Sequence, residues 1–131
     1  MSKRNSLFGL AGAWALAGPA LAHHSFAMFD SVAEIVLQGT VTEFQWTNPH
    51  TWIELDVPTG TGEVVHWSIE GGSTLGLSRE GWHRTTLQRG DKITLVAHPL
   101  KDGSHGGSLM GVTLANGQHL GASIRPATPA K

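Results

Sequence analysis

A pair of alternating runs in the middle of the sequence constrains the fold more than any other feature. The runs, residues 50–57 and 63–70, alternate apolar and polar residues and flank a Pro/Thr/Gly loop at 58–62. This pattern is typical of a β-hairpin, because successive side chains of a strand point to opposite faces. If the five loop residues are unpaired, Val57 faces Glu63, and the pairing of the whole hairpin follows.

This register divides the hairpin into an apolar and a polar face. On the apolar face, Leu55 faces Val65, Ile53 faces Trp67 and Thr51 faces Ile69. The polar face carries His50 opposite Glu70, Trp52 opposite Ser68, Glu54 opposite His66 and Asp56 opposite Val64. We expect the first face to line a hydrophobic core and the second to present two histidine–carboxylate pairs.

The first 22 residues have the organisation of a cleavable signal peptide. Lys3 and Arg4 form a basic segment, residues 7–16 are apolar, and Ala20-Leu21-Ala22 is a small-x-small cleavage pattern. We therefore expect cleavage after Ala22 and a periplasmic or secreted protein. The apolar run is short for a membrane span, so no stable span is expected after removal of the signal.

The composition excludes several function classes. The chain has a formal net charge of −1 at pH 7, and loss of Lys3 and Arg4 makes it −3, which argues against a nucleic-acid partner. There is no cysteine, so thiolate metal sites and cysteine nucleophiles are excluded. All eight histidines follow residue 22, which is the one compositional indication of metal binding. We expect one domain at 23–121 and a disordered tail, rich in Ala and Pro, at 122–131.

A long first strand is expected over residues 34–46. Its apolar residues share one parity up to Val41 and move to the other parity after Thr42. Such a shift close to Gly39 predicts a bulge or a sharp bend. A bent first strand can serve two sheets of a small closed barrel.

The remaining elements complete an OB-like order. Ser73 or Thr74 can cap a short helix before Gly81, Trp82 and Leu87 are expected core anchors, and strands follow at 92–98, around Val112 and at 118–121. We predict an all-β protein with one short helix: a five-stranded OB-like barrel with the helix between strands three and four, a small sandwich or open barrel being the alternative. The expected core is Ile35, Leu37, Val41, Phe44, Ile53, Leu55, Val65, Trp67, Ile69, Leu75, Leu87, Ile93, Leu95 and Val112.

Several short motifs resemble a family of short exported bacterial proteins catalogued as a domain of unknown function. The residues that carry the resemblance are His23-His24-Ser25-Phe26-Ala27-Met28-Phe29-Asp30, Gly39-Thr40-Val41, Trp46-Thr47-Asn48-Pro49-His50 and Gly90-Asp91. The resemblance spans essentially the whole mature chain and implies an exported single-domain protein with an OB-like barrel. It implies no activity, substrate or cofactor.

The first functional hypothesis is a binding module. An OB barrel presents a strand face to its ligands, and Asn48-Pro49 would place His50 at a rigid corner. A protein, a peptide or a small ligand would then bind a face formed by Trp46, His50, Trp52, Glu54, His66 and Glu70. The expected partner is an envelope protein or a small ligand.

The second hypothesis is binding of copper or another divalent metal. Cleavage after Ala22 would make His23 the first residue, and its α-amine and imidazole Nδ1 can chelate Cu(II) together with a further imidazole. The expected metal residues are His23, His24, His50 and His66, with Glu54 or Glu70 orienting an imidazole. Scattered surface histidines are the alternative explanation.

A third hypothesis is hydrolysis with Glu54 and His66 as a general-base pair. No activated serine and no metal–water motif accompanies this pair in the sequence. We therefore expect a protein that is not an enzyme, and a purely structural envelope role completes the alternatives.

Overall fold

The computed structural model describes residues 26–122. The predicted signal peptide, His23, His24 and residues 123–131 of the predicted tail lie outside the described residues. In chain order the elements are η1 (Phe26–Met28), β1 (Ile35–Gln45), β2 (Trp52–Pro58), β3 (Val64–Glu70), α1 (Thr74–Arg79), β4 (Lys92–Pro99), β5 (Gly106–Thr113) and β6 (His119–Gly121). Within 26–122, no helix is long and apolar enough to cross a membrane.

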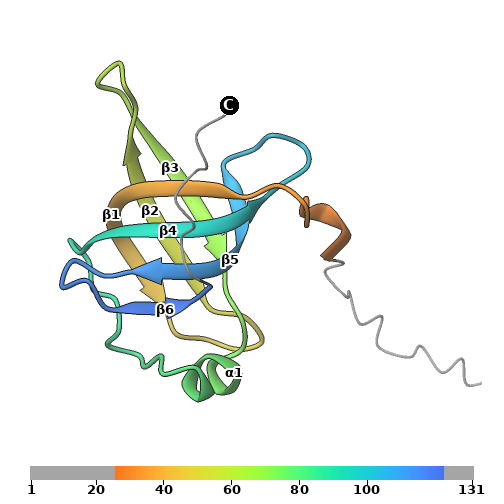
Figure 1. The fold of residues 1–131 in the computed structure, drawn as a ribbon, viewed down its shortest axis with the longest axis vertical. Helices are drawn as coiled ribbons and strands as arrows, with labels where there is room; N and C mark the ends of the chain where they lie inside the picture. Colours follow the sequence, from red (N-terminus) through yellow and green to blue (C-terminus); the bar gives the residue numbers. More distant parts are fainter. Residues whose placement is uncertain (1–25, 123–131) are drawn as a thin grey trace, which may run out of the picture.

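The strands form a closed barrel (Figure 1). Their order is β3-β2-β1-β4-β5-β6, and a parallel pairing of β3 with β5 joins the two ends of the five long strands. The helix α1 lies between β3 and β4 in the chain and sits at the end of the barrel opposite the β2–β3 loop. This arrangement confirms the predicted all-β, five-stranded OB-like barrel with one short helix.

The first strand is bent, as the sequence predicts, and belongs to both halves of the barrel (Figure 1). Residues 35–40 pair with β4 and residues 40–45 pair with β2, with a register shift between Val41 and Glu43. At Gly39, a Cβ atom would lie 2.5 Å from the backbone oxygen of Asp56. The missing side chain therefore allows β1 and β2 to approach closely where β1 bends.

The hairpin register differs from the predicted one by two residues. Asp56 lies opposite His66, and Leu55 lies opposite Trp67. The loop starts one residue later than expected, because Pro58 still pairs with Val64 and the Thr59 N–H donates to the Glu63 carbonyl at 2.7 Å. A shift of two residues preserves side-chain parity, so the predicted faces keep their composition while the cross-strand partners change.

The core contains most of the predicted residues. Leu37, Val41, Ile53, Leu55, Ile69, Leu87, Ile93, Leu95 and Val112 are buried, and Ile35, Phe44 and Trp67 pack against them with partial exposure. Leu75 was wrongly placed in the core, because α1 turns it outward (62% exposed) and buries Leu77 instead. Val65 is half-buried rather than fully buried. Trp82, 1% exposed, is the largest fully buried side chain, which confirms its expected anchoring role.

The segment before β1 is fixed to the barrel by backbone bonds. The N–H of Lys101 donates to the Met28 carbonyl and that of Asp30 to the Pro99 carbonyl, and Phe29 forms a β-bridge with Leu100. Phe29 is buried, whereas Phe26 and Met28 are exposed. Of the three large apolar residues in this segment, Phe29 therefore joins the buried residues, while Phe26 and Met28 stay on the surface.

Candidate functional site

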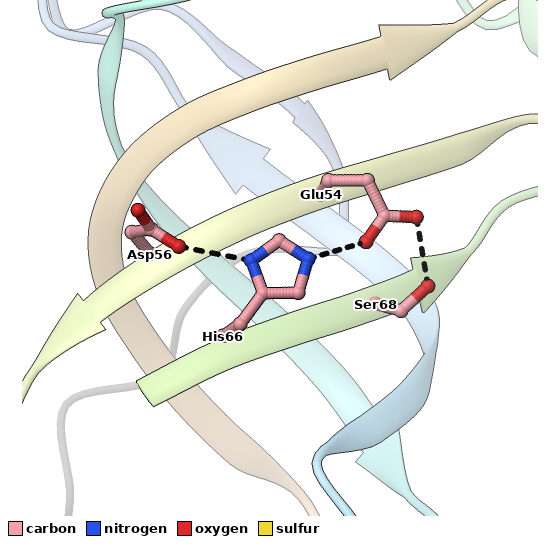
Figure 2. Close-up of polar contacts among 4 residues, drawn as sticks. All are labelled: Glu54, Asp56, His66 and Ser68. Carbon is pink, nitrogen blue, oxygen red and sulfur yellow. Dashed lines mark hydrogen bonds and ion pairs between the residues drawn. The ribbon is translucent and has the colours of Figure 1, made fainter. Parts of the chain in front are cut away.

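The outer faces of β2 and β3 carry a connected polar network (Figure 2). The His66 Nδ1 lies 2.9 Å from the Asp56 Oδ1, and its Nε2 lies 2.9 Å from the Glu54 Oε2. The Ser68 hydroxyl donates to the other oxygen of Glu54 at 2.9 Å. The register produces this row directly, since Asp56 is opposite His66 and Glu54 is opposite Ser68 on the same face.

The two carboxylates favour the charged form of His66. Its pKa is raised above the ordinary 6.5, chiefly by the hydrogen bond that it donates to Asp56 and then by the one that it donates to Glu54, while burial opposes the shift. The doubly bonded imidazolium donates one N–H to each carboxylate and has no free lone pair. His66 therefore ties β2 to β3 and has no nitrogen left for a metal ion.

The same geometry separates Ser68 from the histidine. A nucleophilic serine needs its hydroxyl within hydrogen-bond reach of a basic nitrogen. Here the Ser68 hydroxyl bonds to Glu54, and both nitrogens of His66 are bonded to carboxylates. The Glu54–His66 pair thus has the form of a cross-strand link, and Ser68 does not form a nucleophile–base pair with His66.

We predict that the contribution of His66 to stability decreases as the pH rises. Folding raises the pKa of His66, so its contribution is fully present below the unfolded value near 6.5 and is lost as the pH passes the folded value. Because the His66 side chain is half exposed, we expect an effect of about 1 kcal/mol or less. Urea unfolding of the wild type and His66→Gln should show a larger stability difference at about pH 5.5 than at about pH 8.5.

His83→Gln is the control for this measurement, because the His83 side chain is exposed and its imidazole has no hydrogen-bond partner in the described part of the chain. Its stability difference from the wild type should be the same at both pH values. A pH-independent difference for His66→Gln as well would contradict the doubly bonded imidazolium.

A second histidine–carboxylate pair lies at the other end of the hairpin. The His50 Nδ1 contacts the Glu70 Oε1, and Glu70 is the more buried partner, with only 12% of its side chain exposed. The corner before His50 contains a cis peptide bond between Asn48 and Pro49. Asn48 accepts hydrogen bonds from the backbone N–H and the hydroxyl of Thr74, which ties this corner to the start of α1. The pair predicted from sequence therefore forms, although the register differs.

Three hollows meet at Glu70. The largest, about 440 Å³, extends toward α1 and β5 and also contacts His50 and Phe26. A second, about 260 Å³, lies between Trp52 and the corner before His50, and a third, about 170 Å³, lies between Trp52 and the loop that precedes β5. Glu70 lines all three, while His50 and Trp52 line two each, so these three side chains are the centre of the accessible part of the face.

The structure does not bring all the predicted site residues together. Trp46 follows the β1 bulge with the parity of Phe44, against whose ring it packs at 5.7 Å, and it lines none of the three hollows. The bulge moves Trp46 to the core side of the sheet, away from Trp52. Glu54 and His66 lie further along the hairpin than Glu70, in the network of Figure 2.

The structure also does not bring the predicted metal residues together within residues 26–122. Within residues 26–122, no group of three or more His, Asp or Glu side chains is arranged to hold a metal ion. Both ring nitrogens of His66 are engaged, whereas His50 uses only Nδ1. His23 and His24 lie outside the described residues. Of the predicted metal residues within 26–122, only His50 therefore keeps a ring nitrogen that no carboxylate engages, and it lies at the hollows around Glu70.

Asp56, Ser68 and Phe26 have site positions that the sequence interpretation missed. Asp56 and Ser68 join the His66 network only in the observed register, so locating the loop closure correctly would have identified both. No sequence signal places Phe26 at the hollow beside His50, because this position depends on backbone bonds between the N-terminal segment and residues 99–101.

Comparison with known proteins identifies a family. The model described as "Family of unknown function (DUF6152)" matches residues 12–109. No curated protein and no solved structure matches the chain.

Proposed function

The chain belongs to this family of unknown function, and from its own residues we propose that it is an exported binding protein whose site is the hollowed face around Glu70. The carrying observation is the convergence of three hollows on one carboxylate, flanked by His50 and the Trp52 indole. The signal-like first 22 residues support a periplasmic or secreted location.

The charge of the face indicates the class of ligand. β2 and β3 contain no lysine or arginine, and their outer faces carry Glu54, Asp56 and Glu70. His66 bonds to Glu54 and Asp56, whereas Glu70 is the one of the three carboxylates that lines the hollows. A ligand with an ammonium, guanidinium or amide N–H group can bond to Glu70 while it packs on Trp52. We therefore propose a small cationic ligand or a peptide segment with a cationic side chain.

We predict that Trp52 and Glu70 dominate this binding. Arginine amide, spermidine and tetramethylammonium should be titrated with excess EDTA present, by tryptophan fluorescence and calorimetry. At least one should bind saturably, and Trp52→Ala and Glu70→Gln should each weaken binding by about tenfold or more, because central buried anchors carry most binding energy.

Glu63→Gln is the matched control, since Glu63 is an exposed carboxylate in the loop of the same hairpin. It changes the net charge as Glu70→Gln does but leaves the hollows intact, so its affinity should stay at the wild-type value. Equal affinities for Glu70→Gln and the wild type, or no saturable binding of any of the three probes, would overturn the proposed site.

Metal binding is the second candidate, and one observation favours it. A carboxylate that holds one ring nitrogen of a histidine fixes the tautomer and leaves the other nitrogen free to ligate a metal ion. Glu70 holds the Nδ1 of His50 in this way, at the wall of a hollow that also contacts Phe26. A divalent metal such as copper would then share the site with, or replace, the cationic ligand.

A further inference from the structure

The first half of β3 has a neighbouring strand on one side only. β3 pairs with β2 along its whole length and without a register shift. Its pairing with β5, on the other side, covers only Ser68–Glu70. Within residues 26–122, the segment 64–67 therefore forms an open sheet edge. The end of the hairpin that contains this segment projects beyond the rest of the barrel (Figure 1), so the edge is accessible.

The ladder between β2 and β3 determines which backbone groups point away from the sheet. At its two ends, the Thr59 N–H donates to the Glu63 carbonyl at 2.7 Å and the Gly71 N–H donates to the Thr51 carbonyl at 2.8 Å. Bonded pairs recur at every second residue of an antiparallel ladder. The odd-numbered residues of β3 therefore bond to β2, and the even-numbered residues direct their N–H and C=O groups outward.

Two residues of this edge have unpaired backbone groups. The outward N–H of Ser68 donates to the His105 carbonyl at 3.1 Å, as this alternation requires. The backbone groups of Val64 and His66 form no hydrogen bond within the described part of the chain, and both residues are exposed. An open edge with such groups is a template on which an extended peptide can add as a further strand.

The charge beside this edge favours a basic peptide. The sequence contains no lysine or arginine between Arg4 and Arg79. Asp56 lies opposite His66 on the outer face, and its side chain is 44% exposed. The imidazole contacts the Oδ1 of Asp56, while Oδ2 forms no hydrogen bond within residues 26–122. A guanidinium or ammonium group at this edge can therefore bond to Asp56.

We propose that β3 binds an extended basic peptide segment as an added antiparallel strand, through the N–H and C=O groups of Val64 and His66. The peptide residues bonded to these two positions have their side chains on the outer face. The residue beside His66 is Arg or Lys, directed at Asp56. The residue two positions later lies beside Val64 and is apolar, because Val64 is 62% exposed. Neither Val64 nor His66 lines the hollows around Glu70, so this surface is additional to the proposed site.

The test uses the peptide acetyl-Thr-Thr-Arg-Thr-Val-Thr-Thr-amide, titrated into the wild type by nuclear magnetic resonance at low salt. It should bind saturably and slow the amide hydrogen exchange of Val64 and His66 about tenfold or more. The Val65 amide, which is already bonded to β2, should change less than about twofold. N-methylation of the arginine amide should weaken binding about tenfold, because it removes a backbone bond. Replacement of the arginine by glutamate should weaken it about threefold or more.

Val64→Pro tests the same edge from the protein side. It removes an outward N–H and no bond to β2, so it should fold, as checked by circular dichroism, and bind the peptide about tenfold more weakly. Glu70→Gln is the control and should bind as the wild type does.

The outcomes separate this edge from the site around Glu70. Absence of saturable binding would overturn the proposed edge. Equal binding of the N-methylated peptide, with unchanged exchange at Val64 and His66, would also overturn it, because attraction between charges would then suffice. Loss of peptide binding in Glu70→Gln would place the peptide at the hollows, which contradicts the edge and supports the proposed function.

Discussion

Replacing Trp82 by alanine is expected to destabilise the barrel by about 3–5 kcal/mol. Trp82 is 1% exposed and is the largest of the fully buried side chains, and its ring packs against that of Phe44 at 6.2 Å. Small domains are stable by only about 5–15 kcal/mol, so this loss would remove a large part of the total. Urea unfolding, followed by circular dichroism, measures the difference directly.

Trp82→Phe is the matched variant, because it keeps an aromatic ring and removes the indole N–H. That N–H has no hydrogen-bond partner among residues 26–122, although it is buried. Its removal therefore costs no hydrogen bond, and the phenyl variant should lose less than half as much stability as the alanine variant. An equal loss of stability in Trp82→Phe and Trp82→Ala would contradict this expectation, because it would mean that the indole N–H is bonded in the folded protein.

The residues on each face of the β2–β3 hairpin could be predicted from the sequence, but the cross-strand residue pairs could not. Period-two alternation fixes which side chains share a face, and Ile53, Leu55 and Ile69 are indeed fully buried. Parity alone does not fix pairing, because a shift of two residues preserves it. The pairing depends on loop closure at Thr59 and Glu63 and on the positive φ of Gly62, which a count of loop residues does not reveal.

The contacts of the candidate site were also predicted only in part from the sequence. The His50–Glu70 pair was expected from strand pairing, and it forms because side chains at diagonal positions of a sheet can still reach each other. Of the two bonds of His66, the one to Glu54 was expected and the one to Asp56 was not, since Asp56 becomes its direct neighbour only in the observed register. The hollows that meet at Glu70 depend on α1, β5 and the segment at Phe26, which no local pattern brings together.

These differences give the two histidines separate roles. His66 connects β2 to β3 through two carboxylates and leaves no nitrogen for a ligand. His50 is held by one carboxylate and keeps a free nitrogen at a hollow. Mutation of the two positions should therefore separate the stability of the hairpin from the binding at its accessible end.

The close approach of β1 and β2 at Gly39 lies beside Asp56, one of the two carboxylates that bond to His66. A Cβ atom there would lie 2.5 Å from the Asp56 backbone oxygen and 2.9 Å from the Leu55 Cγ. Contacts this short force the backbone to shift, since the nearest atom is a main-chain oxygen rather than a flexible side-chain end. The strand that would shift carries Asp56, one of the two partners of His66.

Gly39→Ala is therefore expected to cost about 1–3 kcal/mol of stability, the range typical of overpacked sites. It should also shift the imidazole resonances of His66, because displacement of β2 changes the Asp56 contact. Gly60→Ala is the control, since a Cβ atom at Gly60 meets nothing within 4 Å, and its effect should stay within about 0.5 kcal/mol. Urea unfolding and nuclear magnetic resonance of both variants provide the measurement. Equal stabilities of the two variants would mean that β1 and β2 can separate at Gly39 without cost, and an unchanged His66 spectrum in Gly39→Ala would mean that the network does not depend on this approach.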